Sequence, residues 1–72
     1  MHGEGVKIFS NGEKYQGNWS HGKREGLGAY YWDNNSYFYG NWHDDRRHGK
    51  GMMVDENGAR TKGEWVYGNK LI

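Results

Sequence analysis

The sequence predicts an all-β protein: a single-layer, twisted antiparallel meander of three tandem β-hairpins. Three observations support this prediction. Tryptophan recurs every 23 residues, at Trp19, Trp42 and Trp65. Glycine and asparagine recur in the same register, and each repeat contains one turn-forming dipeptide. A fixed period of this length is typical of repeat proteins, in which each unit buries its face against its neighbours.

The turn dipeptides locate the hairpins. They are Asn11-Gly12, Asn34-Asn35 and Asn57-Gly58, and Asn-Gly between alternating runs is the strongest local signal for a two-residue hairpin turn. The flanking segments, such as residues 5–9 and 14–19, are rich in β-branched and aromatic side chains and contain no proline. We therefore expect six strands, linked between hairpins by polar loops.

The turn also predicts the strand register. A two-residue turn at Asn11-Gly12 would pair Ile8 with Tyr15 and Val6 with Gly17. Since side chains alternate between faces, each hairpin then places five residues on a common packing face. Those residues are Val6, Ile8, Tyr15, Gly17 and Trp19; Ala29, Tyr31, Phe38, Gly40 and Trp42; and Met52, Val54, Thr61, Gly63 and Trp65. We expect the repeated glycines and tryptophans of this set to be structural.

The same register predicts an aromatic surface on the opposite face. The second hairpin would place Tyr30, Trp32, Tyr37 and Tyr39 there, and the first would add Phe9. An exposed aromatic patch usually marks an interaction site, so these five residues are the predicted anchors for a partner protein. The alternative is that they cover one another and the neighbouring hairpins, or that the sheet is strongly curved.

Composition excludes several functions. Ten basic and nine acidic side chains give a net charge of +1, whereas a nucleic-acid-binding protein normally shows a strong basic excess. There is no cysteine, and the four histidines lack the spacing of a metal site. No serine lies in a nucleophile motif. We expect no catalytic residue, cofactor or metal, and a cytoplasmic location.

Two basic pairs suggest an alternative ligand. Lys23-Arg24 and Arg46-Arg47 occupy equivalent positions between hairpins. Along one edge of the sheet they could contact an anionic lipid surface, where each basic side chain contributes about 1 kcal/mol. The competing interpretation is a solvated edge balanced by Glu25, Asp44 and Asp45.

The terminal strands, around residues 4–9 and 60–65, would be unpaired in an array of three hairpins. Such edges invite strand addition by a partner chain or by another copy. Further repeats in a longer array could equally cover them.

The recurring pattern resembles the MORN repeat (membrane occupation and recognition nexus). Tyr15-Gln16-Gly17-Asn18-Trp19 followed by residues 21–28 is the best instance, and Phe38-Tyr39-Gly40-Asn41-Trp42 begins the second. The third keeps Gly63 and Trp65 but has Thr61 in place of the aromatic residue. The units would span about residues 2–24, 25–47 and 48–70.

The resemblance implies a single-layer sheet of hairpins without catalysis. MORN arrays occur in scaffolds at membranes or the cytoskeleton, in ciliary proteins such as radial spoke heads, and as segments appended to enzymes, so a regulatory segment of a larger enzyme is a further alternative. Residues 28–35 and 46–49 are most similar to radial-spoke-head repeats, which implies a cytoskeletal, ciliary or membrane-peripheral setting.

Besides Thr61, two further positions depart from the pattern. Asp45 replaces the loop glycine found at Gly22 and Gly68, and Asn35 replaces the turn glycine found at Gly12.

Overall fold

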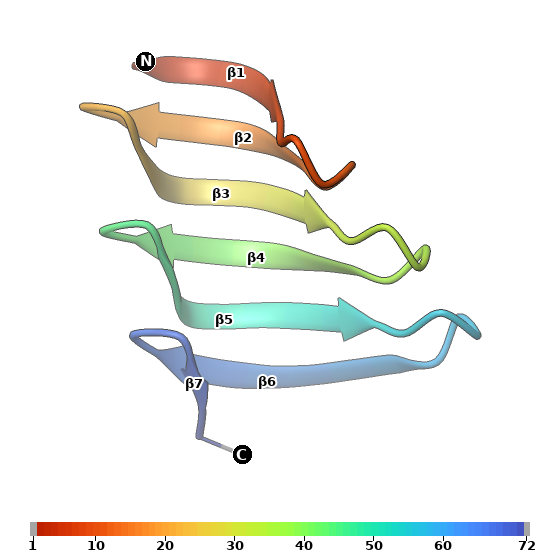
Figure 1. The fold of residues 1–72 in the computed structure, drawn as a ribbon. Helices are drawn as coiled ribbons and strands as arrows, with labels where there is room; N and C mark the ends of the chain where they lie inside the picture. Colours follow the sequence, from red (N-terminus) through yellow and green to blue (C-terminus); the bar gives the residue numbers. More distant parts are fainter. Residues whose placement is uncertain (1, 72) are drawn as a thin grey trace.

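The computed structural model describes residues 2–71 and confirms the predicted fold class. All strands lie in one antiparallel sheet in chain order (Figure 1). They are β1 (Gly3–Ile8), β2 (Lys14–Ser20), β3 (Lys23–Tyr31), β4 (Tyr37–His43), β5 (Arg46–Val54), β6 (Arg60–Val66) and β7 (Asn69–Lys70). The two-residue β7, which pairs with the end of β6, adds to the six expected strands.

The predicted register is wrong by one residue. Gly5 pairs with Gly17, and Val6 pairs with Gln16. The cause is the turn: the backbone N–H of Phe9 donates to the carbonyl of Glu13 at 2.8 Å, so the loop contains three residues, 10–12. Gly12 adopts φ +91°, as three-residue hairpin loops require of their last residue.

The two-residue turns lie between the hairpins instead. His21-Gly22, Asp44-Asp45 and Tyr67-Gly68 each have two successive residues with positive φ, the backbone signature of a type I′ turn. Consequently β3 and β5 begin at Lys23 and Arg46, and most of the segments predicted to be linking loops belong to strands.

The slip changes which residues share a face. A shift of one residue moves every side chain of a strand to the other side of the sheet, and here it affects the first strand of each hairpin. Six residues predicted for the packing face therefore lie on the other side of the sheet from the core tryptophans. They are Val6, Ile8, Ala29, Tyr31, Met52 and Val54. Ile8 is 72% exposed as a result.

We call the two sides the packed face and the open face. The packed face carries Phe9, Tyr15, Trp19, Tyr30, Trp32, Phe38, Trp42, Met53, Thr61 and Trp65. The open face carries Glu4, Val6, Ile8, Lys14, Gln16, Asn18, Leu27, Ala29, Tyr31, Tyr37, Tyr39, Asn41, Lys50, Met52, Val54, Arg60, Lys62 and Glu64.

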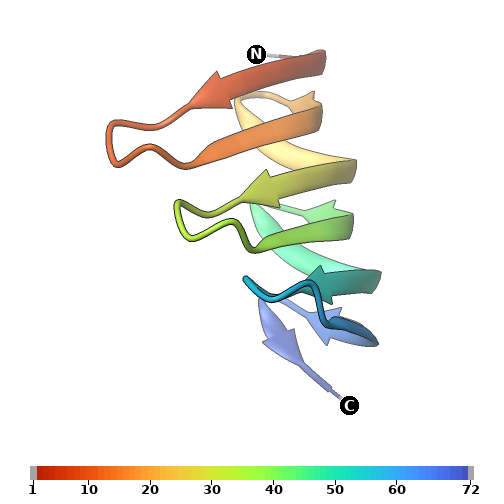
Figure 2. The same cartoon turned by 90° about the vertical axis from the view of Figure 1, so that its right-hand side faces the viewer.

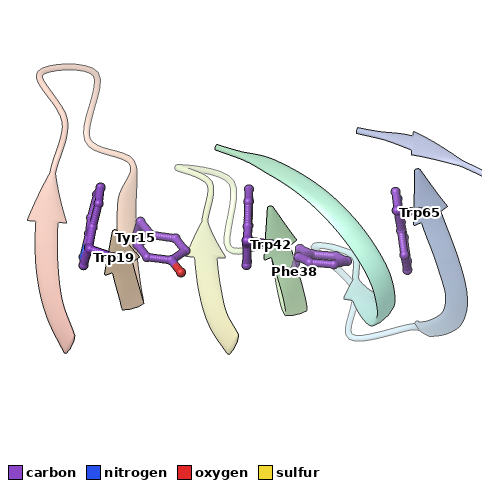
Figure 3. Close-up of a cluster of buried hydrophobic side chains, with 5 residues drawn as sticks. All are labelled: Tyr15, Trp19, Phe38, Trp42 and Trp65. Atoms are coloured by element: carbon purple, nitrogen blue, oxygen red, sulfur yellow. The ribbon is translucent and has the colours of Figure 1, made fainter. Parts of the chain in front are cut away.

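The core is a line of five aromatic rings that crosses the sheet (Figure 3). In order they are Trp19, Tyr15, Trp42, Phe38 and Trp65, and each neighbouring pair meets edge to face at 4.7–5.5 Å between ring centroids. This is the favourable geometry for aromatic quadrupoles. The tryptophans predicted to be structural are therefore buried.

A row of glycines makes room for these rings. One glycine from each long strand lies beside the next across the sheet: Gly5, Gly17, Gly28, Gly40, Gly51 and Gly63. A Cβ atom on Gly28 would lie 2.0 Å from the Tyr15 hydroxyl, and one on Gly51 would lie 2.3 Å from Phe38 Cζ. The rings of Tyr15 and Phe38 thus rest on the backbone of the following repeat.

The strands also curl, so the sheet is a curved single layer (Figure 2). This curvature agrees with the alternative interpretation of the predicted aromatic surface, and Phe9, Tyr30 and Trp32 pack against the core.

Candidate functional site

The structure separates the five predicted anchor residues. Tyr37 and Tyr39 lie on the open face, whereas Phe9, Tyr30 and Trp32 pack against the aromatic core. They do not form the single surface that the sequence predicted, because the extra turn residue inverts the first strand of each hairpin.

The three packed aromatics form an outer layer over the core. The Tyr30 ring centroid lies 5.6 Å from that of Phe9 and 5.1 Å from that of Trp32. Its hydroxyl donates to Glu13 Oε1 at 2.5 Å. Burial, together with this carboxylate, raises the pKa of Tyr30 to about 12. These rings remain half-buried, so their outer surfaces are accessible.

The open face holds a shallow groove of about 570 Å³. Its floor is the backbone of the glycine row, and its walls are side chains on either side of that row. The lining residues are Leu27, Tyr39, Gly40, Lys50, Gly51, Met52, Lys62, Gly63 and Glu64. From this set the sequence predicted only Tyr39 as a partner-binding residue, whereas Gly40 and Gly63 were predicted to be structural. Alternation along β3 and β5 would have placed Leu27 and Met52 on this face, but only with the correct loop length of three residues.

The first basic pair is neutralised by acidic residues of the next repeat. Lys23 Nζ lies 2.8 Å from Asp44 Oδ1, and Arg24 Nε lies 2.6 Å from Asp45 Oδ1. The Arg24 guanidinium also lies over the Trp42 ring, with its Cζ atom 4.6 Å from the ring centroid. Such stacking is a favourable cation–π geometry.

The second basic pair lacks equivalent partners. Arg46 lies over the Tyr67 ring at 5.9 Å. Arg47 is half-buried over Phe38, at 5.6 Å, and donates through Nη2 to the carbonyl of Gly68 at 3.2 Å. Burial, and then the nearby Arg24 charge, lowers the pKa of Arg47. Within residues 2–71 neither arginine forms an ion pair with an acidic group.

One histidine is hydrogen-bonded to a carboxylate. His43 Nδ1 lies 2.7 Å from Glu25 Oε2, and this hydrogen bond lowers the pKa of Glu25. No group of three metal-ligating side chains occurs within residues 2–71. The same part of the chain contains no helix that could cross a membrane.

Comparison with known proteins gives one family. The family model described as MORN repeat matches residues 1–14, 15–37 and 38–60. The second and third matched segments each contain 23 residues, in agreement with the tryptophan period. A search of curated proteins finds no match.

Proposed function

Because this chain belongs to the MORN repeat family, whose repeats are generally modules that bind proteins or membranes, we propose that it is a non-enzymatic protein-interaction scaffold. A partner-protein segment docks in the open-face groove, with Tyr39 as the principal anchor.

The observation that carries this proposal is the exposure of apolar side chains around a bare backbone floor. Tyr39 and Leu27 are each 49% exposed on opposite sides of the glycine row. Tyrosine is enriched among residues that dominate binding energies, and the floor between the two walls of the groove is strand backbone. The groove therefore has both an anchor and space for a segment lying across the strands.

The basic side chains of the open face indicate the charge of the partner segment. Lys50 and Lys62 line the groove together with one acidic residue, Glu64. Lys14 and Arg60 lie on the same face. The matching segment combines apolar side chains for the groove with acidic residues at its flanks.

Affinity purification from the native source, with identification of the co-purifying proteins, supplies the partner. Calorimetry of that partner with Tyr39→Ala and Trp32→Ala then separates the two faces. We expect Tyr39→Ala to weaken binding by at least about 2 kcal/mol, as for an interface hot spot, and Trp32→Ala to have little effect on binding. Unchanged binding by Tyr39→Ala excludes the groove. A loss confined to Trp32→Ala transfers the interaction to the packed-face aromatics, including Phe9 and Tyr30.

We place the scaffold in a cytoskeletal or ciliary complex, with repeat units at about residues 2–24, 25–47 and 48–70. This finer proposal rests on the radial-spoke-like character of residues 28–35 and 46–49. The expectation of a free edge along residues 60–65 is wrong in part, because β7 pairs with the end of β6 and the N–H of Leu71 donates to the Glu64 carbonyl. The outer edge of β1 and the beginning of β6 are further places for a partner strand or a second copy. Localisation of the tagged protein in ciliated cells tests the setting, and light scattering tests self-association.

An anionic membrane is the second candidate, favoured by Arg46 and Arg47, which form no ion pair with an acidic group among residues 2–71. Against it, Lys23 and Arg24 are engaged by acidic residues. Liposome sedimentation separates the candidates: salt-sensitive binding that is lost on neutralising Arg46 and Arg47 supports the membrane, and no binding at low salt excludes it.

A further inference from the structure

The packed face contains two hollows that are related by the repeat. The first is lined by Arg24, Tyr30, Trp32, Trp42, Asp45, Arg46, Arg47 and Gly68. The second is lined by Arg47, Met53, Thr61, Trp65, Gly68 and Lys70. Five lining residues of the second lie 23 positions after five of the first, so the two hollows are the same site in successive repeats. They can therefore be compared residue by residue.

In the first hollow the protein supplies its own carboxylate. Asp45 Oδ1 accepts hydrogen bonds from Arg24 Nε at 2.6 Å and from the Arg24 backbone N–H at 3.2 Å. Although partial burial opposes its ionisation, these hydrogen bonds hold the pKa of Asp45 below its usual range. The Arg24 charge is thereby compensated close to the aromatic rings.

The second hollow keeps the backbone frame of the first but lacks the carboxylate. The N–H of Gly68 donates to the Arg47 carbonyl at 2.8 Å, as the N–H of Asp45 donates to the Arg24 carbonyl at 3.1 Å. Arg47 Nη2 donates to the Gly68 carbonyl just as Arg24 Nη2 donates to the Asp45 carbonyl. Only the acidic side chain is missing, because glycine occupies position 68.

The missing carboxylate leaves a basic hollow. Arg47 is half-buried without an acidic partner among residues 2–71, and Lys70 adds a second positive charge to the lining. A partly buried charge is costly unless it is paired. The hollow therefore has a net preference for an anion.

We propose that this hollow binds the carboxylate of an aspartate or glutamate side chain from a partner protein, in the position that the Asp45 carboxylate occupies in the preceding repeat. The equivalent hollow shows that a carboxylate on a short side chain fits the frame. Met53 and Trp65 provide apolar walls for the methylene groups of the acidic side chain. The site lies on the packed face and is separate from the Tyr39 groove.

The matched variants follow from the repeat. Gly68→Asp supplies the carboxylate within the chain. Position 68 has φ +91° and an added Cβ would meet nothing within 4 Å, while Asp45 adopts φ 70° at the equivalent place. Gly22→Asp is the control, because it adds the same charge at the corresponding turn of the first repeat, away from the hollow. Arg47→Gln removes the cation.

The test uses nuclear magnetic resonance titration with the peptide acetyl-Gly-Asp-Asp-Gly-amide and its Asn-Asn analogue. We expect saturable shifts of the Arg47 Nε–H, Gly68 N–H and Trp65 indole signals with the acidic peptide only. Binding should weaken at least roughly tenfold in Gly68→Asp and in Arg47→Gln, since charge-assisted hydrogen bonds contribute about 1.5–3 kcal/mol. Gly22→Asp should bind as the unmodified chain does.

Three outcomes overturn the proposal. The acidic peptide produces no shifts at these signals, or binding survives in Gly68→Asp, or the shifts spread equally over the open-face lysines. Vesicles of phosphatidylcholine and phosphatidylserine are tested separately. If Gly68→Asp abolishes binding to the vesicles but not to the peptide, the hollow is a lipid site instead. Tyr39→Ala leaves the peptide shifts unchanged, so failure of the groove and failure of this hollow are distinguishable.

Discussion

Replacing Trp42 with alanine tests the central element of the fold. Trp42 is buried and meets two rings edge to face, those of Tyr15 at 5.3 Å and Phe38 at 5.5 Å. Its indole Nε1–H donates to the carbonyl of Gly28 at 3.1 Å. The terminal tryptophans each meet only one ring of this line, Trp19 that of Tyr15 and Trp65 that of Phe38.

The magnitude follows from these contacts. Truncating a buried tryptophan typically costs about 3–5 kcal/mol, and each edge-to-face pair contributes about 0.5–1.5 kcal/mol beyond burial. Trp42→Ala should therefore destabilise the protein by about 0.5–1.5 kcal/mol more than Trp19→Ala or Trp65→Ala. At roughly 0.05–0.15 kcal/mol per residue a chain of this length has about 4–11 kcal/mol of stability, so Trp42→Ala unfolds the protein if its stability lies at the lower end of that range.

Urea unfolding followed by far-ultraviolet circular dichroism measures this ranking. Trp42→Phe is the control, because it keeps an aromatic ring while it removes part of the ring volume and the hydrogen bond to Gly28, the latter at a cost of about 0.5–1.5 kcal/mol. A Trp42→Ala protein that is as stable as Trp19→Ala would refute the idea that the central ring is held from both sides.

Three further predictions concern single side chains. Gly40→Ala should destabilise by about 1–3 kcal/mol in urea unfolding, because its Cβ would lie 2.5 Å from the Gly51 Cα atom; unchanged stability would contradict the close approach. Burial raises the pKa of Tyr15 to about 12, so stability present below the unfolded pKa of about 10 is lost as the pH rises through about 12. Tyr15→Phe should reduce that loss in thermal melts, and an unaltered alkaline profile argues against it. Although burial opposes ionisation of Asp45, the Arg24 hydrogen bonds lower its pKa. Stability that is present above the unfolded pKa of about 3.9 is therefore lost as the pH falls through the folded pKa. Asp45→Asn should reduce the fall of the melting temperature at acidic pH.

The strand order and the core tryptophans were predictable, because the period of 23 and the turn dipeptides are properties of the sequence itself. Tyr15, Phe38 and the glycines of the second strands also fall on the predicted face. The register was not predictable from Asn11-Gly12 alone. The same dipeptide suits a two-residue turn and the end of a three-residue loop, and only the latter places Phe9 on the core.

The same ambiguity explains the error in the candidate site. Alternation along each strand was correctly read, so Tyr37 and Tyr39 share a face and Tyr30 and Trp32 share the other. Their relation across the turn depended on one residue of loop length. The pairing of Arg24 with Asp45 could have been sought from the sequence, since Asp45 was recognised as an unusual replacement for glycine.

The glycine row has a consequence for how such a protein changes length. Each of the Tyr15 and Phe38 rings rests on backbone that belongs to the following unit, so neither the first nor the second unit is complete by itself. Insertion or loss of a whole 23-residue unit keeps each ring on a glycine of the following unit, whereas an insertion of any other length places a ring over the wrong residue. Growth by duplication of complete blocks is therefore the one route that preserves this architecture at every step.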